Sequence, residues 1–222
     1  MHKIVGFLSG TRLFAGIEKD ELFSILKCLT HKMVKYLKGE TIIAEGDKIS
    51  SIGMIMNGSA HLTLDDFWGN RSIIAKISAG ELFGEVYAYR ADKPVNISVT
   101  AAENSEIIYF YFNKVVNVCK SACKFHNRLI NNLFNIVSEK NLMLTRKMQC
   151  ITKRTTREKL LAYLSNEYAR QGKSRFVIPF NRQELADYLS VDRSAMSNEL
   201  SKLRKEGIIS YNKNEFQLLD SR

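Results

Sequence analysis

Near the C-terminus, apolar residues recur at helical spacing in two short segments that a polar turn separates. The first segment begins at Asn181 with Glu184 three residues later, an arrangement that caps the start of a helix. Residues 190–192 form the turn, where Val191 can fill the space between two helices and Asp192 can cap the second. The apolar positions are Leu185, Ala186 and Leu189 before the turn and Met196, Leu200 and Leu203 after it. This pattern predicts a helix, a turn and a second helix over residues 181–207.

The opposite face of the second predicted helix carries only hydrogen-bonding side chains: Arg193, Ser194, Ser197, Asn198 and Lys202. Such a row suits the edges of DNA bases, although a merely solvated helix face has the same pattern. Residues 207–219 favour the first interpretation, because two short apolar stretches surround a polar turn at 212–214, as in a β-hairpin. Helix, turn, helix and hairpin in this order predict a winged helix-turn-helix that binds double-stranded DNA.

Between residues 31 and 112 the apolar stretches are short, and apolar and polar residues alternate within them. Glycines at 46, 58, 69 and 80 mark turns at intervals of about ten residues, and strands are expected at 52–56 and 73–77. A helical lead-in at 11–29 precedes this region. The pattern predicts an antiparallel β-barrel or sandwich of the size of a sensor domain.

Residues 113–150 contain no glycine or proline and return to helical spacing. Two interleaved series of residues seven apart form a seam: Ile130, Phe134, Val137, Asn141, Leu144 and Met148. A heptad seam with one polar break predicts pairing with a second helix, here from a second copy of the chain. The additional apolar residues Leu133, Ile136 and Leu142 favour packing against the chain's own β domain, and we expect both contacts.

These elements define an α+β fold in three parts. We expect a β-roll effector-sensing domain at 1–112, a dimerisation helix at 113–150 and a winged helix-turn-helix domain at 151–222. The last part would start with a polar hinge at 152–156 and a helix at 157–170, and the strand expected at 175–179 could pair with the wing.

Charge is concentrated beside the predicted DNA-binding motif. The chain has 33 Lys and Arg residues against 23 Asp and Glu residues. Residues 151–222 hold 14 basic and 9 acidic side chains, the same excess as the preceding 150 residues, which hold 19 and 14. The higher charge density near the motif is what a surface that faces phosphates requires.

The four cysteines, Cys28, Cys119, Cys123 and Cys150, show neither a Cys-x-x-Cys pair nor the framework of a secreted protein. No apolar run approaches the length of a membrane span, and no signal peptide is evident. We therefore expect a cytoplasmic protein without a membrane partner. Cys119, Cys123 and His126 share one helix face, so a metal or redox sensor is an alternative, but ordinary core cysteines have the same pattern and we predict no metal site.

Several motifs together resemble the cyclic-AMP receptor protein / fumarate-nitrate reduction regulator (Crp/Fnr) family of bacterial transcription regulators. They are the segments 38–47, 55–59, 80–85, 182–186 and 191–197, and the resemblance covers nearly the whole chain. It implies a homodimeric, sequence-specific DNA-binding regulator that is not an enzyme, contacts RNA polymerase and responds to an effector in its cyclic nucleotide-binding-like domain. The alternative is a small-molecule-binding module, or a metal or redox sensor, that acts through protein contacts.

The resemblance places the effector site at Gly84 and Glu85 and, about ten residues later, at Val95 and Asn96. Members that bind cyclic nucleotides have Arg-Ser or Arg-Thr at the later pair, where the arginine neutralises the cyclic phosphate. Because Val95 cannot do so, we predict an effector other than cyclic AMP. Phe83 and Tyr87 indicate an apolar or aromatic ligand, or else simply fill the barrel. An iron–sulfur cluster is not expected, since only Cys28 lies near the N-terminus, and the cofactor remains unknown.

The resemblance also assigns DNA contacts. Arg193, Ser194 and Asn198 occupy base-reading positions, but Ser194 stands where glutamate is usual and Asn198 where arginine is usual. We therefore expect an operator that differs from that of the best-known members, with Arg193 on guanine and Asn198 on adenine. The remaining predicted contacts are to phosphates, from Arg182, Gln183, Ser197 and Lys202.

Overall fold

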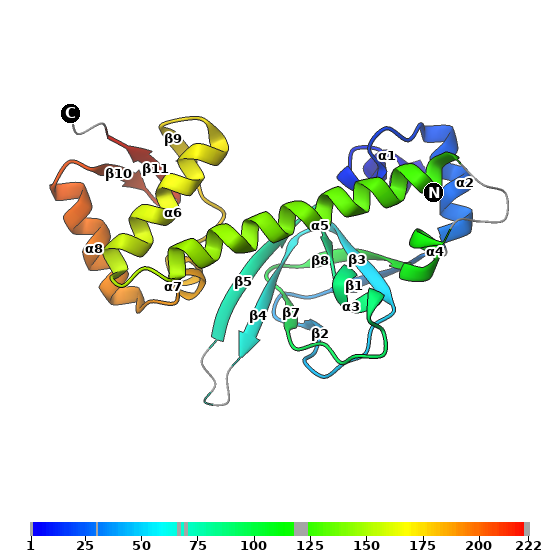
Figure 1. Cartoon of the computed structure of the whole chain (residues 1–222), viewed down its shortest axis with the longest axis horizontal. Coiled ribbons are helices and arrows are strands. Elements are labelled where there is room, and N and C mark those ends of the chain that lie inside the picture. Colours follow the sequence, from blue (N-terminus) through cyan, green and yellow to red (C-terminus); the bar gives the residue numbers. More distant parts are fainter. Residues whose placement is uncertain (1, 30, 66–67, 69–70, 118–123, 220–222) are drawn as a thin grey trace. The chain divides into compact units, whose positions relative to one another are not determined.

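The computed structural model of the chain describes residues 2–29, 31–65, 68, 71–117 and 124–219 (Figure 1). Its contacts divide it into two compact units. Unit 1 comprises Met1–Asn70 and Ile74–Glu139, and unit 2 comprises Arg71–Ile73 and Lys140–Arg222. The long helix α5 (Lys124–Ile151) contributes residues to both units. The division into three parts at residues 112 and 150 stays a prediction.

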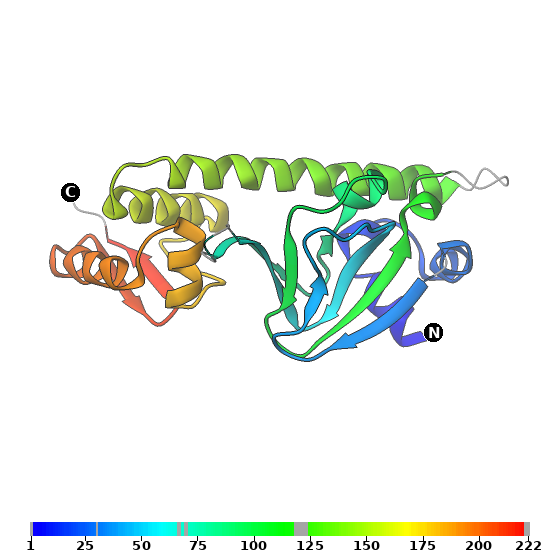
Figure 2. The same cartoon turned by 90° about the horizontal axis from the view of Figure 1, so that it is seen from below.

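Unit 1 is built on two four-stranded sheets whose curved strands are seen from a second direction in Figure 2. One sheet has the order β1-β8-β3-β6 and the other β2-β7-β4-β5. The strands are β1 (His31–Tyr36), β2 (Thr41–Ile43), β3 (Ser51–Asn57), β4 (Ser59–Asp65), β5 (Arg71–Ser78), β6 (Leu82–Phe83), β7 (Ser98–Ala101) and β8 (Ser105–Tyr111). Neighbours such as β3 and β8 pair antiparallel, as the glycine-punctuated alternation predicts. The α+β fold with an N-terminal β-roll is confirmed.

Short helices surround these sheets. They are α1 (His2–Leu8), a 3₁₀ helix (Arg12–Phe14), α2 (Lys19–Leu29), α3 (Glu85–Tyr89) and α4 (Phe112–Val116). The lead-in expected at 11–29 is thus a 3₁₀ turn followed by α2. The region expected to be helical from residue 113 contains two helices, since α4 ends at Val116 and α5 begins at Lys124.

Apolar side chains form two separate cores in unit 1. One core packs α1, α2 and the first half of α5 against one sheet, and it includes Leu26, Phe110, Leu129, Leu133 and Ile136. The other fills the space between strands of both sheets and includes Ile43, Ile55, Phe83, Val95 and Val99. The side of α5 that carries Leu129, Leu133 and Ile136 is therefore buried within its own unit.

Unit 2 contains the C-terminal elements, from α6 (Thr156–Gln171) onward. They continue with β9 (Arg175–Val177), α7 (Arg182–Leu189), α8 (Arg193–Lys205), β10 (Ile209–Asn212) and β11 (Glu215–Leu218). The three strands form a sheet in the order β10-β11-β9, in which Phe216 pairs with Phe176. The expected pairing of the 175–179 strand with the wing is confirmed. None of the helices in the described parts of the chain has the length and apolar character needed to cross a membrane.

One buried cation joins three elements of unit 2. Lys147 of α5 is 8% exposed, and its Nζ donates a hydrogen bond to the carbonyl oxygen of Ile73 at the start of β5. The same ammonium lies 4.4 Å from the centre of the Tyr188 ring on α7. Burial lowers the pKa of Lys147 to about 8. The ammonium therefore links α5, β5 and the helix-turn-helix at an electrostatic cost.

This cost predicts a pH-dependent stability. The native-state pKa of Lys147 is about 8, below the ordinary value of 10.5, so the unfolded chain binds more protons between these two pH values. The free energy of unfolding should therefore rise with pH in this window, relative to that of Lys147→Met, by about 1–3 kcal/mol. The contact with the Tyr188 ring favours the charged form and offsets part of the rise. Urea unfolding of both proteins from pH 7.5 to 10.5 measures the difference, and a constant difference would contradict the prediction.

Candidate nucleic-acid interface

The first helix of the helix-turn-helix begins with the predicted capping box. The side-chain oxygen Oδ1 of Asn181 accepts from the backbone N–H of Glu184 at 3.0 Å. In return, the Glu184 carboxylate accepts from the backbone N–H of Asn181 at 2.9 Å. Leu185, Ala186 and Leu189 are fully buried behind this cap. The sequence signal for the start of α7 is thus confirmed at the level of individual hydrogen bonds.

The turn between α7 and α8 depends on an unusual backbone conformation and on a neighbouring lysine. Ser190 has a positive φ of 52°, and the backbone N–H of Val191 donates to the carbonyl of Ala186 at 3.0 Å. Lys159 of α6 donates from Nζ to the carbonyl oxygens of Leu189 at 3.4 Å and Ser190 at 3.2 Å. A cation at the C-terminus of a helix stabilises its last carbonyl groups. No local sequence pattern indicates this role of Lys159, because its partners follow it by about thirty residues.

The second helix, α8, has its N-terminus capped by Asp192, as expected. Its Oδ1 accepts from the backbone N–H of Ala195 at 2.8 Å and from the Ser194 hydroxyl at 2.5 Å. Both bonds hold the pKa of Asp192 below its usual value, and the bond from the Ser194 hydroxyl has the larger effect. Met196, Leu200 and Leu203 are buried on the inner face, whereas Arg193 and Asn198 are exposed on the outer face. The two faces predicted from the sequence are both present.

The side chains predicted to contact DNA differ in whether they already form hydrogen bonds or ion pairs within the chain. Ser194 is bound to Asp192, and the Ser197 hydroxyl donates to the carbonyl of Arg193 at 2.9 Å. The Lys202 ammonium lies 2.7 Å from the Glu199 carboxylate, and the Gln183 amide donates to Asp187 at 2.8 Å. Within the described part of the chain, the side chains of Arg193 and Asn198 form no such bond. These two are the side chains most available to an external partner.

Arg182 lies in a different environment from the other predicted contacts. Its guanidinium carbon is 4.8 Å from the centre of the Tyr211 ring and 5.0 Å from that of Phe216, both in the wing. Burial lowers the pKa of Arg182 below its ordinary value. The sequence motif alone gave no indication of this contact, because its two rings come from the wing, about thirty residues further along the chain.

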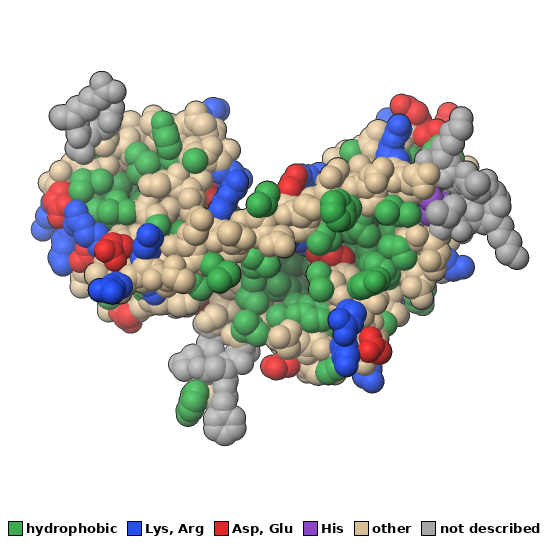
Figure 3. All heavy atoms as spheres, viewed as in Figure 1, with side chains coloured by type: hydrophobic (Ala, Val, Ile, Leu, Met, Phe, Trp, Pro, Cys, Tyr) green, Lys and Arg blue, Asp and Glu red, His purple; other side chains and the backbone are tan. Residues whose placement is uncertain are grey.

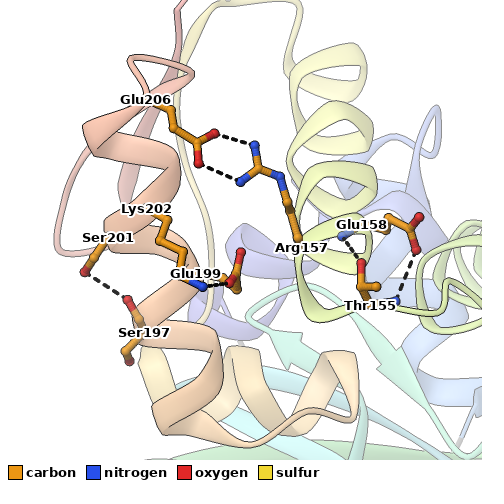
Figure 4. A network of polar contacts seen from close by, with 8 residues as sticks. All are labelled: Thr155, Arg157, Glu158, Ser197, Glu199, Ser201, Lys202 and Glu206. Carbon is orange, nitrogen blue, oxygen red and sulfur yellow. Dashed lines mark hydrogen bonds and ion pairs between the residues drawn. The ribbon is translucent and has the colours of Figure 1, made fainter.

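A polar network ties the end of α8 to α6 (Figure 4). Both terminal nitrogens of Arg157 donate to the Glu206 carboxylate, at 2.9 and 2.5 Å. The last turn of α8 carries three basic residues, Lys202, Arg204 and Lys205. Figure 3 shows Lys and Arg side chains gathered over this edge of unit 2. Phosphate groups would meet a concentrated positive charge there.

The predicted effector residues lie around the start of α3 in unit 1. Gly84, with a φ of 80°, precedes the buried Glu85, and the Tyr87 hydroxyl donates to the amide oxygen of Asn96 at 2.5 Å. The Val95 side chain is buried in the core between the sheets. Val95 and Asn96, the later pair of predicted effector positions, therefore supply an apolar side chain and an amide to this region, and no cation.

Phe83 has a structural role in this region. Its ring crosses the backbone of Gly53, where a side chain on Gly53 would collide with it, and it packs edge-to-face on Tyr109 with the centroids 6.2 Å apart. A hollow of about 450 Å³ in unit 1 lies elsewhere, lined by residues such as Lys35, Tyr36, Glu40 and Asn104. None of its lining residues belongs to the predicted effector set.

The structure does not test the alternative of a metal or redox sensor, since Cys119 and Cys123 lie outside the described residues. His126 is buried, with Nε2 3.3 Å from the carbonyl oxygen of Lys114. Among the described residues, no three His, Cys, Asp or Glu side chains gather as a metal site. Cys150 is buried and accepts a hydrogen bond from Asn166, and burial raises the pKa of its thiol.

Most of the predicted dimer seam is exposed on α5, but Val137 packs against the core of unit 1. Phe134 is 71% exposed and Met148 is 61% exposed, and both Asn141 and Leu144 are exposed as well. Ile130 and Val137 are half-buried. The additional residue Leu142 is exposed rather than buried, so it does not join Leu133 and Ile136 on the β-roll side.

A β-roll, a long helix and a winged helix-turn-helix define a class of DNA-binding regulators, and two comparisons with families agree with this class. Residues 33–122 match the cyclic nucleotide-binding domain, and residues 158–222 match the Crp-like helix-turn-helix domain. The chain belongs to the Crp/Fnr family of transcription regulators. The helix-turn-helix regulators of this family bind DNA and are not enzymes.

Individual relatives are distant in sequence but similar in length. The chain is 25% identical to the transcriptional activator protein FnrL of Cereibacter sphaeroides, over 88% of this chain and 78% of that protein. It is 22% identical to the cyclic AMP receptor protein of Thermus thermophilus, over 91% and 89%. The structure of the c-di-GMP responsive global regulator CLP of Xanthomonas campestris has a TM-score of 0.70 at 14% identity, covering 92% of this chain and 100% of that one.

The capping box gives a prediction about the stability of the helix-turn-helix. Asn181→Ala should lower the free energy of unfolding by about 1 kcal/mol, because the N–H of Glu184 loses its acceptor. Asn181→Ser is the matched control, since a serine hydroxyl can accept the same bond and should retain most of the stability. Urea unfolding measures both. Equal losses in the two variants would show that the cap contributes nothing specific.

Proposed function

We propose that this Crp/Fnr regulator binds a near-palindromic DNA site as a homodimer and is controlled by an effector other than cyclic AMP. The observation that carries the DNA-reading part is the outer face of α8. There, Arg193 and Asn198 are exposed and form no hydrogen bond or ion pair within the described parts of the chain, while the opposite face is buried. Such a helix can enter the major groove with its polar side towards the base edges.

Base reading follows from the chemistry of these two side chains. A guanidinium at the first position of α8 can donate two parallel bonds to guanine, and the Asn198 amide can pair with adenine. Ser194 is short, and its hydroxyl is held by Asp192 at 2.5 Å. Ser194 therefore contributes less to base selection than the glutamate that is usual at this position would.

Phosphate contacts supply affinity and set the register on the duplex. We assign them to Gln183 on α7 and to Ser197 and Lys202 on α8. The Lys202 side chain is 62% exposed and pairs with Glu199, which is 19% exposed. Because the lysine side chain is mostly exposed, its ammonium can reach a phosphate.

Dimerisation is supported by the exposed seam of α5. Within one chain, Phe134, Leu144 and Met148 leave apolar surface in contact with water, while the other side of the helix is already buried on the β-roll. A second copy of α5 would cover this surface in heptad register, with Asn141 specifying the register. Two recognition helices in such a dimer read half-sites about 34 Å apart.

The effector site is assigned to the region of Gly84, Glu85, Tyr87 and Asn96. Val95 cannot neutralise a cyclic phosphate, which supports a ligand of different chemistry. The names of related regulators, one a cyclic AMP receptor protein and another c-di-GMP responsive, indicate that one fold serves several ligands. Effector binding would act through α5, whose residues belong to both units, and through the segment between α5 and α6.

The division between base and phosphate contacts can be tested by mutation. Arg193→Ala should reduce affinity for the preferred site by about 1–3 kcal/mol and relax base preference at one position of each half-site. Lys202→Ala should weaken binding to all sequences evenly and lower the salt dependence by about one phosphate contact. Gel shifts measure both effects, with the DNA upstream of the gene that encodes this chain and with a library of randomised DNA sites.

Lys173→Ala is the control for lost charge, since this exposed residue lies between α6 and β9, away from α8. If Arg193→Ala and Lys202→Ala weaken every sequence equally, the assignment of Arg193 to base reading is wrong.

The dimer interface has its own test. Replacing the exposed seam residues Phe134 and Leu144 together with glutamate should give monomers, because charged side chains cannot be buried unpaired in a helix seam. Their affinity for a complete palindrome should fall to that for a single half-site. Sedimentation measures the mass, and Lys140→Glu is a control for added negative charge on the same helix. A double variant that remains dimeric would place the interface elsewhere.

A further inference from the structure

Arg182 lies against two aromatic rings of the wing, and its place in the DNA-binding motif does not explain this contact. Tyr211 on β10 and Phe216 on β11 are paired across the hairpin, and their ring centres are 5.6 Å apart. The Arg182 guanidinium lies against both rings, at 4.8 and 5.0 Å. A second cation, Arg204 of α8, lies 5.4 Å from the centre of the Tyr211 ring.

These contacts join elements that are far apart along the chain. Arg182 is the first residue of α7, and Arg204 lies in the last turn of α8. Tyr211 therefore contacts a cation from each end of the helix-turn-helix. A planar guanidinium stacks on aromatic faces in a way that a lysine ammonium cannot reproduce.

The two halves of the wing are held differently. At its base, Ile209 is fully buried in the core of unit 2, and on β11 this core extends outwards to Phe216, which pairs with Tyr211. Further out, Tyr211 is only half-buried, and residues 212–214 at the tip are exposed. Lys213 stands at this tip with a φ of 52°, and Gly207, with a φ of 74°, precedes the wing. On the β11 side, β9 holds the outer half of the wing, since the N–H of Ile178 donates to the carbonyl of Asn214 at 2.9 Å and Arg175 pairs with Glu215 at 2.8 Å. The cation contacts on Tyr211 hold the β10 side.

We propose that Arg182 is a positioning residue, which holds the outer half of the wing so that Lys213 meets a DNA phosphate. In this view Arg182 contributes to DNA binding through Tyr211, instead of contacting a phosphate itself as its place in the motif implies. The expected effect on DNA affinity rests on the proposed function. The contact with the wing does not, since it is present in the free protein.

The first experiment uses the free protein. Amide hydrogen exchange at residues 210–215 is compared among the wild type, Arg182→Lys and Tyr211→Leu, with Lys173→Ala as the control for an altered exposed cation. We expect exchange in this segment to rise at least threefold in the first two variants and to stay unchanged in the control. Wild-type exchange rates in both variants would overturn the proposal, whatever the DNA results.

The second experiment measures affinity for the palindromic DNA site against salt concentration. Arg182→Lys keeps the charge, so a direct phosphate contact predicts nearly unchanged affinity. A positioning role predicts a loss of about tenfold and a slope lower by about 0.9, the contribution of one phosphate. Tyr211→Leu should cause the same losses, although it leaves Arg182 free to reach a phosphate.

A double-mutant cycle with Lys213→Ala completes the test. If Arg182 acts through Lys213, removing Lys213 should cost little in the Arg182→Lys background. Independent, multiplicative losses would overturn the proposal, even where amide exchange rises. If the wild type binds no DNA, the proposed function fails, while the exchange data on the free protein still decide whether Arg182 holds the wing. Circular dichroism melting of each variant confirms that it is folded.

Discussion

The DNA-binding part of this regulator depends on a single constraint, which is that α8 must bury one face and leave the other entirely polar. Met196, Leu200 and Leu203 enter the core of unit 2, so the 3.6-residue period directs Arg193 and Asn198 outwards. Contacts at both ends then hold the helix, through the Asp192 cap at its start and the Arg157–Glu206 pair at its end. A recognition surface needs such support, because the helix that carries it must be held in place before the DNA arrives.

The long helix α5 is continuous between the two compact units, since its residues belong to both. Its first half is buried on the β-roll through Leu129, Leu133 and Ile136, and Lys147 in its second half binds β5 and α7 within unit 2. A buried ammonium is expensive, and it persists where the surrounding structure holds it in place. Under the proposed function, a change in the β-roll would reach the DNA-binding unit along this covalently continuous helix.

The region around α3, which is the proposed effector site, combines a glycine turn with a largely apolar surrounding. Gly84 still starts α3 with a left-handed conformation, and Glu85 is still buried. Val95 replaces the cation that a cyclic phosphate requires, and the Phe83 ring fills the space beside Gly53. If this region binds the effector, fold and ligand specificity are separable, because the sheets depend on apolar packing and turn glycines, whereas specificity would depend on a few polar side chains.

The sequence by itself determined the local elements of this protein, because capping boxes, glycine turns and apolar periodicity act over a few residues. The α7 cap at Asn181, the buried and polar faces of α8, and the pairing of β9 with the wing were all predictable in this way. Only the tertiary structure decided which polar side chains remained available. Arg182 lies on rings that follow it by about thirty residues, Lys159 caps α7 from another helix, and Lys147 is buried. Such contacts join residues distant along the chain, so no local pattern encodes them.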